Sequence, residues 1–500
     1  MREIPTPSVN KPESKPETSS FQIREVGKVR SIKQFIAVVS GLNSCINGQK
    51  VEFEKGMRGF VMGFNEEKVQ VLVLGSPRGI RGGDEVYNRG ESFLLPTGEG
   101  FLGRVVNSLC EPQDGLGPIR ADKMMAVFQE APAVLDREQL SQSMETGTFA
   151  LDAGIPVAKG QRQLFIGDRG TGKTTIAIDA ILNQKGKNVV CIYCCVGKPY
   201  SSLLRILSLL HEREAMPYTI VVSAVASTSP GEQYMAPYTA AMLGEYFMQS
   251  GRDVLVAFDD LTKHAWVYRQ ISLLLERPPG REAYPGDIFY IHSQLLERAG
   301  RYTKELGGGT MTFLPIIEIL QGDVTGYIPT NLISITDGQI YFSTALFNKG
   351  IKPPVDFGLS VSRIGNKGQW PAMRDVSKSL RLEYLQYQEL LQMTQLRSGG
   401  LSKESEAKLK RGEALSQLLM QPKNKPRPVE EQIFCLIALS RGVLDVLSAP
   451  QIRKFREEIM EFARARDPEI LAELASTQKM TEENKNRIIE CMKKYFEAGA

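Results

Sequence analysis

Short apolar runs that alternate with polar positions dominate the chain from residue 21 to about residue 93. Examples are FIAVVSGL and KVQVLVLG, separated by glycine-containing turns. In the second run the valines share one face of a strand and the leucines share the other: Val69, Val71 and Val73 against Leu72 and Leu74. Such a strand fits a small closed or two-sided sheet, and we predict a compact β-barrel over residues 23–95.

Beyond Gly98 the pattern changes to apolar strands that alternate with helical stretches. The strands include QLFIG, NVVCIYCCVG and DVLVAFDD, and the helical stretches include TTIAIDAILNQKG and APYTAAMLGEYFMQSG. This order is typical of a parallel sheet with helices on its faces. We therefore predict a central α/β domain over residues 96–370.

After about Trp370 the strand pattern ends, and charged amphipathic segments such as SKSLRLEYLQYQELLQM take over. These segments predict a C-terminal helical bundle over residues 371–500. The chain starts with four prolines among Ser, Glu and Lys and with almost nothing that a core could bury. Residues 1–22 are therefore predicted to form a disordered tail. The predicted fold class is multidomain α/β, with barrel, α/β domain and helical bundle in that order.

The amino-acid composition says little about which molecules the protein binds. The 61 basic and 57 acidic residues leave a formal net charge of +4, so no charge excess points to nucleic acid or an anionic membrane surface. No run approaches the roughly 18 apolar residues of a membrane span. Three of the seven cysteines lie in VVCIYCCVG, which favours reduced thiols in a core strand over redox or metal chemistry. The histidines, His211, His264 and His292, lie far apart without ligand-type neighbours, and we predict structural or surface roles for them.

The segment LFIGDRGTGKTTIAIDAI carries the pattern G-x-x-x-x-G-K-T between an apolar strand and a periodic helix. Backbone amides and the helix N-terminus can converge on phosphate oxygens there, because the glycines let the chain curl around an anion. Lys173 adds a mobile positive charge, and the Thr174 hydroxyl is a magnesium ligand type. A plain glycine turn before a helix is the alternative. The predicted nucleotide-binding residues are Gly167, Asp168, Arg169, Gly170, Thr171, Gly172, Lys173 and Thr174.

A second apolar strand, DVLVAFDD, ends in two carboxylates. Asp259, in preference to Asp260, is the predicted magnesium ligand, and either carboxylate can instead cap the following segment. Hydrolysis also needs a group that polarises the attacking water, usually a carboxylate or amide on a strand beside the phosphates. After NVVCIYCCVG the chain continues Lys198-Pro199-Tyr200, without a carboxylate. The residues thus predict a site for ATP or ADP with Mg²⁺ that lacks a general base.

Long blocks of the chain resemble the alpha subunit of the F-type ATP synthase, from about Val26 to the C-terminus. They include FLGRVVNSLCEPQDGLGPI, GQRQLFIGDRGTGKTTIAID, DDLTKHAWVYRQISLLLERPPGREAYPGDIFYIHSQLLERAG, GLSVSRIG and PVEEQIF. The resemblance implies a RecA-like central P-loop domain and a ring in which alpha and catalytic beta subunits alternate around a rotating gamma stalk. It also implies coupling of ATP synthesis or hydrolysis to ion transport through a membrane sector. The expected location is the cytoplasmic face of a bacterial inner membrane, or the equivalent organelle membrane, as a peripheral protein.

The resemblance also assigns roles to single residues. Arg363 in GLSVSRIG matches the arginine that reaches the phosphates bound by the adjacent catalytic subunit, a task that suits an always-charged guanidinium. Gln421 in LLMQPKNKPRP keeps the family residue of the adenine-side loop. Lys198 stands where the catalytic relative has the glutamate that polarises water. Both lines of reasoning therefore predict a non-catalytic subunit.

Some positions depart from the family. Glutamine is usual where this chain has Gly170, Lys198 and Lys423, so nucleotide affinity or base preference can differ. The proline-bearing tail replaces an amphipathic helix that commonly docks the delta-type subunit of the peripheral stalk, which leaves that contact open. These departures motivate the hypothesis of a second, divergent bacterial F-type complex that lacks this stalk subunit, with sodium as an alternative to the proton as the coupled ion.

Two other functions would share the barrel, the phosphate loop and the arginine. A self-sufficient homohexameric ATPase of the secretion or flagellar type should carry a glutamate where Lys198 stands. An RNA-translocating hexamer of the transcription-terminator type should show aromatic residues and basic loops for single strands in its barrel. Neither feature is in the sequence, so we expect a ring subunit without a nucleic-acid partner.

Overall fold

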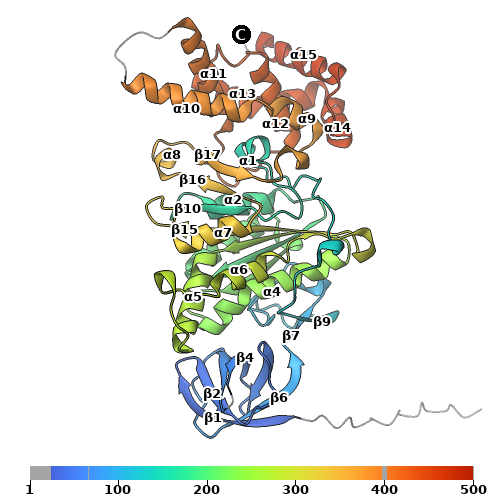
Figure 1. The fold of residues 1–500 in the computed structure, drawn as a ribbon. Helices are drawn as coiled ribbons and strands as arrows, with labels where there is room; N and C mark the ends of the chain where they lie inside the picture. Colours follow the sequence, from blue (N-terminus) through green and yellow to red (C-terminus); the bar gives the residue numbers. More distant parts are fainter. Residues whose placement is uncertain (1–23, 66, 397–401, 499–500) are drawn as a thin grey trace, which may run out of the picture.

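The computed structural model describes residues 24–65, 67–396 and 402–498, which form three domains stacked along one axis (Figure 1). The blue barrel lies at one end, the α/β domain in the middle and the orange and red helices at the other end. This arrangement confirms the predicted fold class. The predicted tail, residues 1–22, lies outside the described residues. The domain boundaries predicted after residues 22, 95 and 370 stay predictions.

The N-terminal barrel closes in the strand order β1-β2-β5-β4-β3-β6. Its strands are β1 (Glu25–Lys33), β2 (Ile36–Ser40), β3 (Gln49–Phe53), β4 (Arg58–Phe64), β5 (Val69–Leu74) and β6 (Glu85–Ser92). The predicted valine face of β5 belongs to the core inside the barrel. Leu72 and Leu74 belong to the core that the barrel shares with the middle domain. Both faces of β5 are covered, which is why the run is apolar at almost every position.

The middle domain is built on one large sheet with the strand order β17-β16-β10-β15-β13-β11-β12-β8. Its strands are β8 (Val105–Val106), β10 (Leu164–Asp168), β11 (Val189–Val196), β12 (Thr219–Ala224), β13 (Asp253–Asp259), β14 (Gly300–Arg301), β15 (Thr310–Ile319), β16 (Gly338–Phe342) and β17 (Val355–Ser362). The pairs from β8 to β16 are parallel, whereas β17 and β14 pair antiparallel with β16 and β15. A smaller ribbon, β7 (Leu94–Thr97) with β9 (Lys123–Ala126), lies between this sheet and the barrel.

Helices cover both faces of the sheet, as the alternating pattern predicts. Even-numbered residues of β11, such as Ile192 and Cys194, pack in one core with α4 (Pro230–Gln249), α5 (Leu261–Leu274) and α6 (Ile288–Leu296). Odd-numbered residues, such as Tyr193, pack in another core with α2 (Lys173–Leu182) and α3 (Tyr200–Glu212). Every residue of β11 is buried, and its three cysteines are buried free thiols, as predicted; the other four cysteines are also buried and free.

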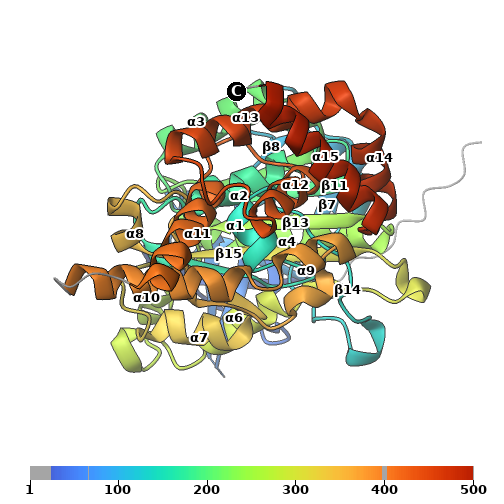
Figure 2. The ribbon, with the colours of Figure 1, turned by 90° about the horizontal axis from the view of Figure 1, so that it is seen from above.

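The C-terminal helices α9–α15 lie over the middle domain when seen along the long axis of the molecule (Figure 2). They are α9 (Pro371–Ser377), α10 (Leu380–Leu396), α11 (Lys403–Leu419), α12 (Val429–Ser440), α13 (Ala449–Arg466), α14 (Pro468–Thr477) and α15 (Glu482–Ala498). Helix α12 is buried over most of its length and packs against α1 (Phe149–Gly154) of the middle domain. None of the helices in the described part of the chain combines the length and the apolar character that crossing a membrane requires.

Two of the three histidines, which lie far apart in the sequence, lie close together in space. The rings of His264 on α5 and His292 on α6 have centroids 6.0 Å apart, and both side chains are fully buried. Tyr234 of α4 stacks on His264. The sequence separates the two histidines, but α5 and α6 both pack against α4. Their structural role is confirmed, and His211 lies exposed on α3.

Candidate functional site

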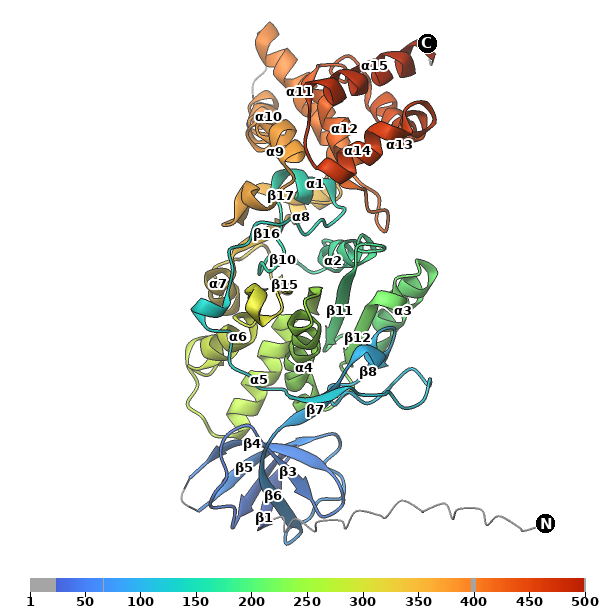
Figure 3. The same ribbon diagram turned by 90° about the vertical axis from the view of Figure 1, so that its right-hand side faces the viewer.

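The carboxyl ends of four neighbouring parallel strands meet at one edge of the sheet. These strands are β10, β15, β13 and β11, and the loop Gly167–Thr174 follows the first of them. Figure 3 shows α2, β11 and α3 next to one another at this edge. A cavity of about 600 Å³ opens here between the loop and the first residues of α3 and α5. In an open α/β sheet this edge is the usual place for a ligand.

The loop has the backbone that an anion site needs. Gly170 and Gly172 have φ angles of 84° and 97°, in the left-handed region that favours glycine. Helix α2 begins at Lys173 without a side chain that caps its first turn, so free backbone N–H groups point out of its N-terminus. An anion in the cavity would meet these N–H groups and the positive end of the helix dipole.

Lys173 is buried and presently bonds to the loop itself. Its Nζ donates to the carbonyl oxygens of Gly167 at 2.7 Å and Asp168 at 2.6 Å. Burial lowers the pKa of Lys173 to about 8, and the nearby carboxylates, Glu318 first among them, act in the opposite direction. A phosphate group would add the negative charge that favours the protonated amine.

The predicted loop residues divide into two groups. Arg169, Gly170, Gly172, Lys173 and Thr174 line the cavity, whereas Gly167, Asp168 and Thr171 do not. The Asp168 carboxylate accepts hydrogen bonds from Gly322 N at 2.9 Å and Thr344 Oγ1 at 2.5 Å. The Thr171 hydroxyl donates to the Asp168 carbonyl at 2.8 Å. Asp168 and Thr171 thus fix the shape of the loop.

The two predicted magnesium ligands are in direct contact. Thr174 Oγ1 donates to Asp259 Oδ2 at 2.8 Å, and the Tyr193 hydroxyl donates to the same carboxylate oxygen at 2.7 Å. Hydroxyl and carboxylate oxygens are donors that Mg²⁺ accepts. The Lys198 ammonium, however, contacts both of them: Nζ lies 2.5 Å from Asp259 Oδ1 and 2.9 Å from Thr174 Oγ1. The oxygen atoms of Thr174 and Asp259 fit Mg²⁺, but the Lys198 ammonium occupies the position beside them.

The other carboxylates of the cavity have partners of their own. Asp260 caps α5 by accepting from Lys263 N at 2.8 Å, which was the alternative role considered for it. Burial and the adjacent Asp259 raise the pKa of Asp260 to about 7. Glu318, at the end of β15, pairs with Lys263 at 3.3 Å. Asp259 and Glu318 are thus paired with cations of the protein, whereas Asp260 Oδ2 is buried without a hydrogen-bond partner in the described structure.

Sequence reasoning missed Tyr193, Lys263 and Glu318. All three reach the site only because β11, β13, β15 and α5 are neighbours in the fold. One signal was available: Tyr193 is a polar-tipped residue in an otherwise apolar core strand, and such a hydroxyl needs a buried partner. The partners themselves depend on the order of the strands, which the sequence pattern does not give.

Gln421 lies outside the lining of this cavity. Its amide is used inside the protein: Oε1 accepts from Phe149 N at 3.0 Å, and Nε2 donates to the carbonyls of Gly147 and Lys425, each at 2.8 Å. The side chain therefore ties the loop after α11 to the segment before α1. Its predicted contact with adenine stays a prediction.

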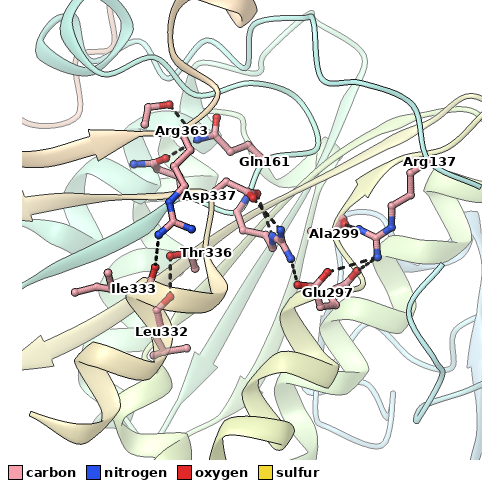
Figure 4. A network of polar contacts seen from close by, with 12 residues as sticks. Arg137, Gln161, Glu297, Ala299, Leu332, Ile333, Thr336, Asp337 and Arg363 are labelled. Carbon is pink, nitrogen blue, oxygen red and sulfur yellow. Dashed lines mark hydrogen bonds and ion pairs between the residues drawn. The ribbon is translucent and has the colours of Figure 1, made fainter. Parts of the chain in front are cut away.

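Arg363 lines a different cavity, of about 330 Å³, beyond the end of β17 (Figure 4). Its backbone N–H donates to the Asp337 carbonyl at 2.8 Å, and its exposed guanidinium makes one long contact of 3.4 Å with the Ile333 carbonyl. The Asp337 carboxylate accepts three hydrogen bonds from Arg162, one from the backbone N–H and two from the guanidinium, which also pairs with Glu297. Arg363 is thus held by its backbone, with the charged end at the surface.

Comparison with known proteins places these features in a family. Models of the ATP synthase alpha/beta family match the chain three times: the beta-barrel domain at residues 22–90, the nucleotide-binding domain at 147–362 and the C-terminal domain at 369–495. The chain is 47% identical over 473 residues to an ATP synthase subunit alpha of Clostridium kluyveri, covering 94% of each chain. It is 44% identical over 479 residues to that of Wolinella succinogenes, covering 95% of this chain and 96% of the relative.

Proposed function

Because the chain belongs to the ATP synthase alpha/beta family, and to the alpha subunits within it, we propose that it binds ATP or ADP without hydrolysing it and acts on a neighbouring catalytic subunit through Arg363. An ATP synthase alpha subunit is part of an ATP synthase complex, so turnover belongs to that assembly. The observation that carries the proposal is Lys198, a cation at the strand end where a general base would stand.

Nucleotide binding is supported by the charge of the cavity. Arg169, Lys173, Lys198, Arg205 and Lys263 line it, against the carboxylates of Asp259, Asp260 and Glu318. The uncapped start of α2 adds backbone donors. Lys173 can exchange its two carbonyl acceptors for phosphate oxygens, which are stronger acceptors because they carry charge.

The lack of a general base is supported by the contacts of the carboxylates. A base must have an oxygen free to take a proton from water. Both oxygens of Asp259 have partners, Glu318 pairs with Lys263, and Asp260 caps α5 with Oδ1 while its unpartnered Oδ2 is buried away from water. ATP bound here would be positioned without a group that activates water.

A role of Arg363 in trans is supported by its position. It lies outside the phosphate cavity and is exposed. Two other arginines line the cavity of about 330 Å³ together with Arg363, and both have carboxylate partners: Arg162 and Arg301. A guanidinium with so few partners can bridge phosphate oxygens of a neighbouring subunit as charge spreads over them in the transition state.

The proposal extends to the assembly. The chain would alternate with catalytic beta subunits around a gamma stalk, with a peripheral stalk and a membrane sector completing the complex at a bacterial or organelle membrane. The coupled ion is proposed to be the proton, with sodium as the alternative, and the delta-type contact is open. Gln421 is proposed to border the adenine through the loop that it holds.

The test is ATP hydrolysis and nucleotide binding of the purified full chain, alone and mixed with a catalytic beta subunit. We expect the chain alone to bind ATP without turnover and the mixture to hydrolyse ATP. Brisk hydrolysis by the chain alone would contradict the proposal and favour a self-sufficient homohexameric ATPase.

A further inference from the structure

The predicted magnesium position has an unusual neighbour, the ammonium of Lys198. It contacts both predicted ligand atoms, Thr174 Oγ1 at 2.9 Å and Asp259 Oδ1 at 2.5 Å. Mg²⁺ binds oxygen at about 2.0–2.1 Å and keeps a strict octahedral shell. An ion on these donors would lie against the ammonium, and the two like charges would repel each other.

We propose that Lys198 takes the place of the magnesium ion at this site, so that the chain binds metal-free nucleoside triphosphate or diphosphate. This inference rests on the proposed function, since it concerns the ligand of the same cavity. It replaces the Mg²⁺ that the sequence pattern predicts at Thr174 and Asp259.

Hydrogen bonds hold the backbone around Lys198, which fixes the point from which its side chain reaches the site. Gly197 N donates to the Ala224 carbonyl at 2.8 Å, and Ala226 N donates to the Lys198 carbonyl at 2.9 Å. Gly197 has a φ of 63°, and a Cβ there would lie 2.8 Å from Lys263 Cβ. The end of β11 is thereby locked against β12 and α5.

Burial strengthens the contact. The Lys198 side chain is 17% exposed and the Asp259 side chain 1% exposed. The Tyr193 hydroxyl holds the second Asp259 oxygen at 2.7 Å, which orients the carboxylate toward Lys198. If a metal ion displaced the Lys198 ammonium from Asp259, the ammonium would lose its carboxylate partner in a poorly solvated place. This loss would cost free energy.

The chemistry of an ammonium suits binding better than phosphoryl transfer. Lys198 has three N–H donors. Asp259 and Thr174 take two, which leaves one for a phosphate oxygen in the cavity. A single charge with directional donors holds a phosphate, whereas a divalent metal also polarises it for attack. An ammonium in place of Mg²⁺ therefore agrees with a site that binds its nucleotide without cleaving it.

The experiment measures ATP binding to the purified full chain by calorimetry, in excess MgCl₂ and in excess EDTA. For the unmodified chain we expect binding in EDTA to be at least about tenfold tighter than in MgCl₂, because excess Mg²⁺ holds the ATP in a complex that this site does not accept. For Lys198→Gln we expect binding in EDTA to be at least about tenfold weaker than in MgCl₂, a difference of about 1.4 kcal/mol. The matched control is Arg205→Gln, an exposed cation of the same cavity that contacts Ser201 and Ser202.

Arg205→Gln should weaken binding equally in both conditions and leave their ratio unchanged. Equal or tighter binding of ATP to the unmodified chain in MgCl₂ would overturn the inference, and this measurement depends on no variant. An unchanged ratio in Lys198→Gln would also overturn it. Failure of the unmodified chain to bind ATP in either condition would instead contradict the proposed nucleotide site, and the inference with it.

Discussion

Arg298 and Glu245 form a bidentate ion pair inside the α/β domain, with Arg298 Nε and Nη2 donating to the two carboxylate oxygens at 2.5 and 2.7 Å. Both side chains are almost fully buried, and Arg298 also donates to the Val127 carbonyl at 2.9 Å. Glu245 lies on α4 and Val127 follows β9, so the pair joins the helix layer to the segment above the barrel.

Glu245→Gln should lower the free energy of unfolding by about 3–5 kcal/mol, because it leaves the buried Arg298 charge without its counter-ion. Urea unfolding of the full chain measures this loss. The control is Glu99→Gln, which removes the partner of Arg252 in an exposed pair and should cost less than about 1 kcal/mol. Equal losses in both variants would contradict the importance of burial.

Arg363→Lys should not replace the arginine. In a mixture with the catalytic subunit, we expect both Arg363→Lys and Arg363→Ala to reduce kcat by roughly 1000-fold, because an ammonium cannot bridge two phosphate oxygens as a guanidinium does. ATP binding to the isolated chain should be unchanged, since Arg363 lies outside the phosphate cavity. Lys367→Ala, in the same cavity as Arg363, is the control. Full activity of Arg363→Ala would refute the in-trans role.

Stability should fall as the pH drops below about 6.5, because two histidines are buried in the neutral form. Burial lowers the pKa of His264 to about 4 and that of His292 to about 3. Between these values and the unfolded value of about 6.5, the unfolded chain binds more protons than the folded chain. Each histidine then costs about 1.4 kcal/mol of unfolding free energy per pH unit.

His292→Leu tests this pH dependence. Neither ring nitrogen of His292 has a hydrogen-bond partner in the described structure, so the variant loses no hydrogen bond there. Compared with the unmodified chain, it should gain more stability at about pH 5.5 than at about pH 7.5. Urea unfolding at the two pH values gives the comparison, and an equal effect at both would show that His292 does not titrate on unfolding.

Gln421→Ala should distinguish a base-side role from a purely structural one. If the loop held by Gln421 borders the adenine, ATP binds more weakly to the variant while inorganic tripolyphosphate binds as before. The variant should also lose about 1–3 kcal/mol of stability, because the buried Phe149 N–H loses its acceptor. Equal weakening of both ligands would assign Gln421 to the fold alone.

The sequence by itself predicted the three-part fold class, which the structure confirms, and it named the loop before α2 and the carboxylate of Asp259 as candidates for the site. The reason is that periodicity, glycine spacing and an apolar strand ending in a carboxylate act over a few neighbouring residues. It also determined that no carboxylate follows β11, because that is a statement about one position, Lys198.

Only the tertiary structure decided what Lys198 does. Its ammonium reaches Asp259 and Thr174 because β11 pairs directly with β13, and because only β15 separates β13 from β10, the strand that leads into α2. The meeting of His264 with His292 has the same origin, since α5 and α6 share α4 as a neighbour. Strand order and helix packing result from burial summed over the whole chain, so a local pattern could name these residues but not their partners.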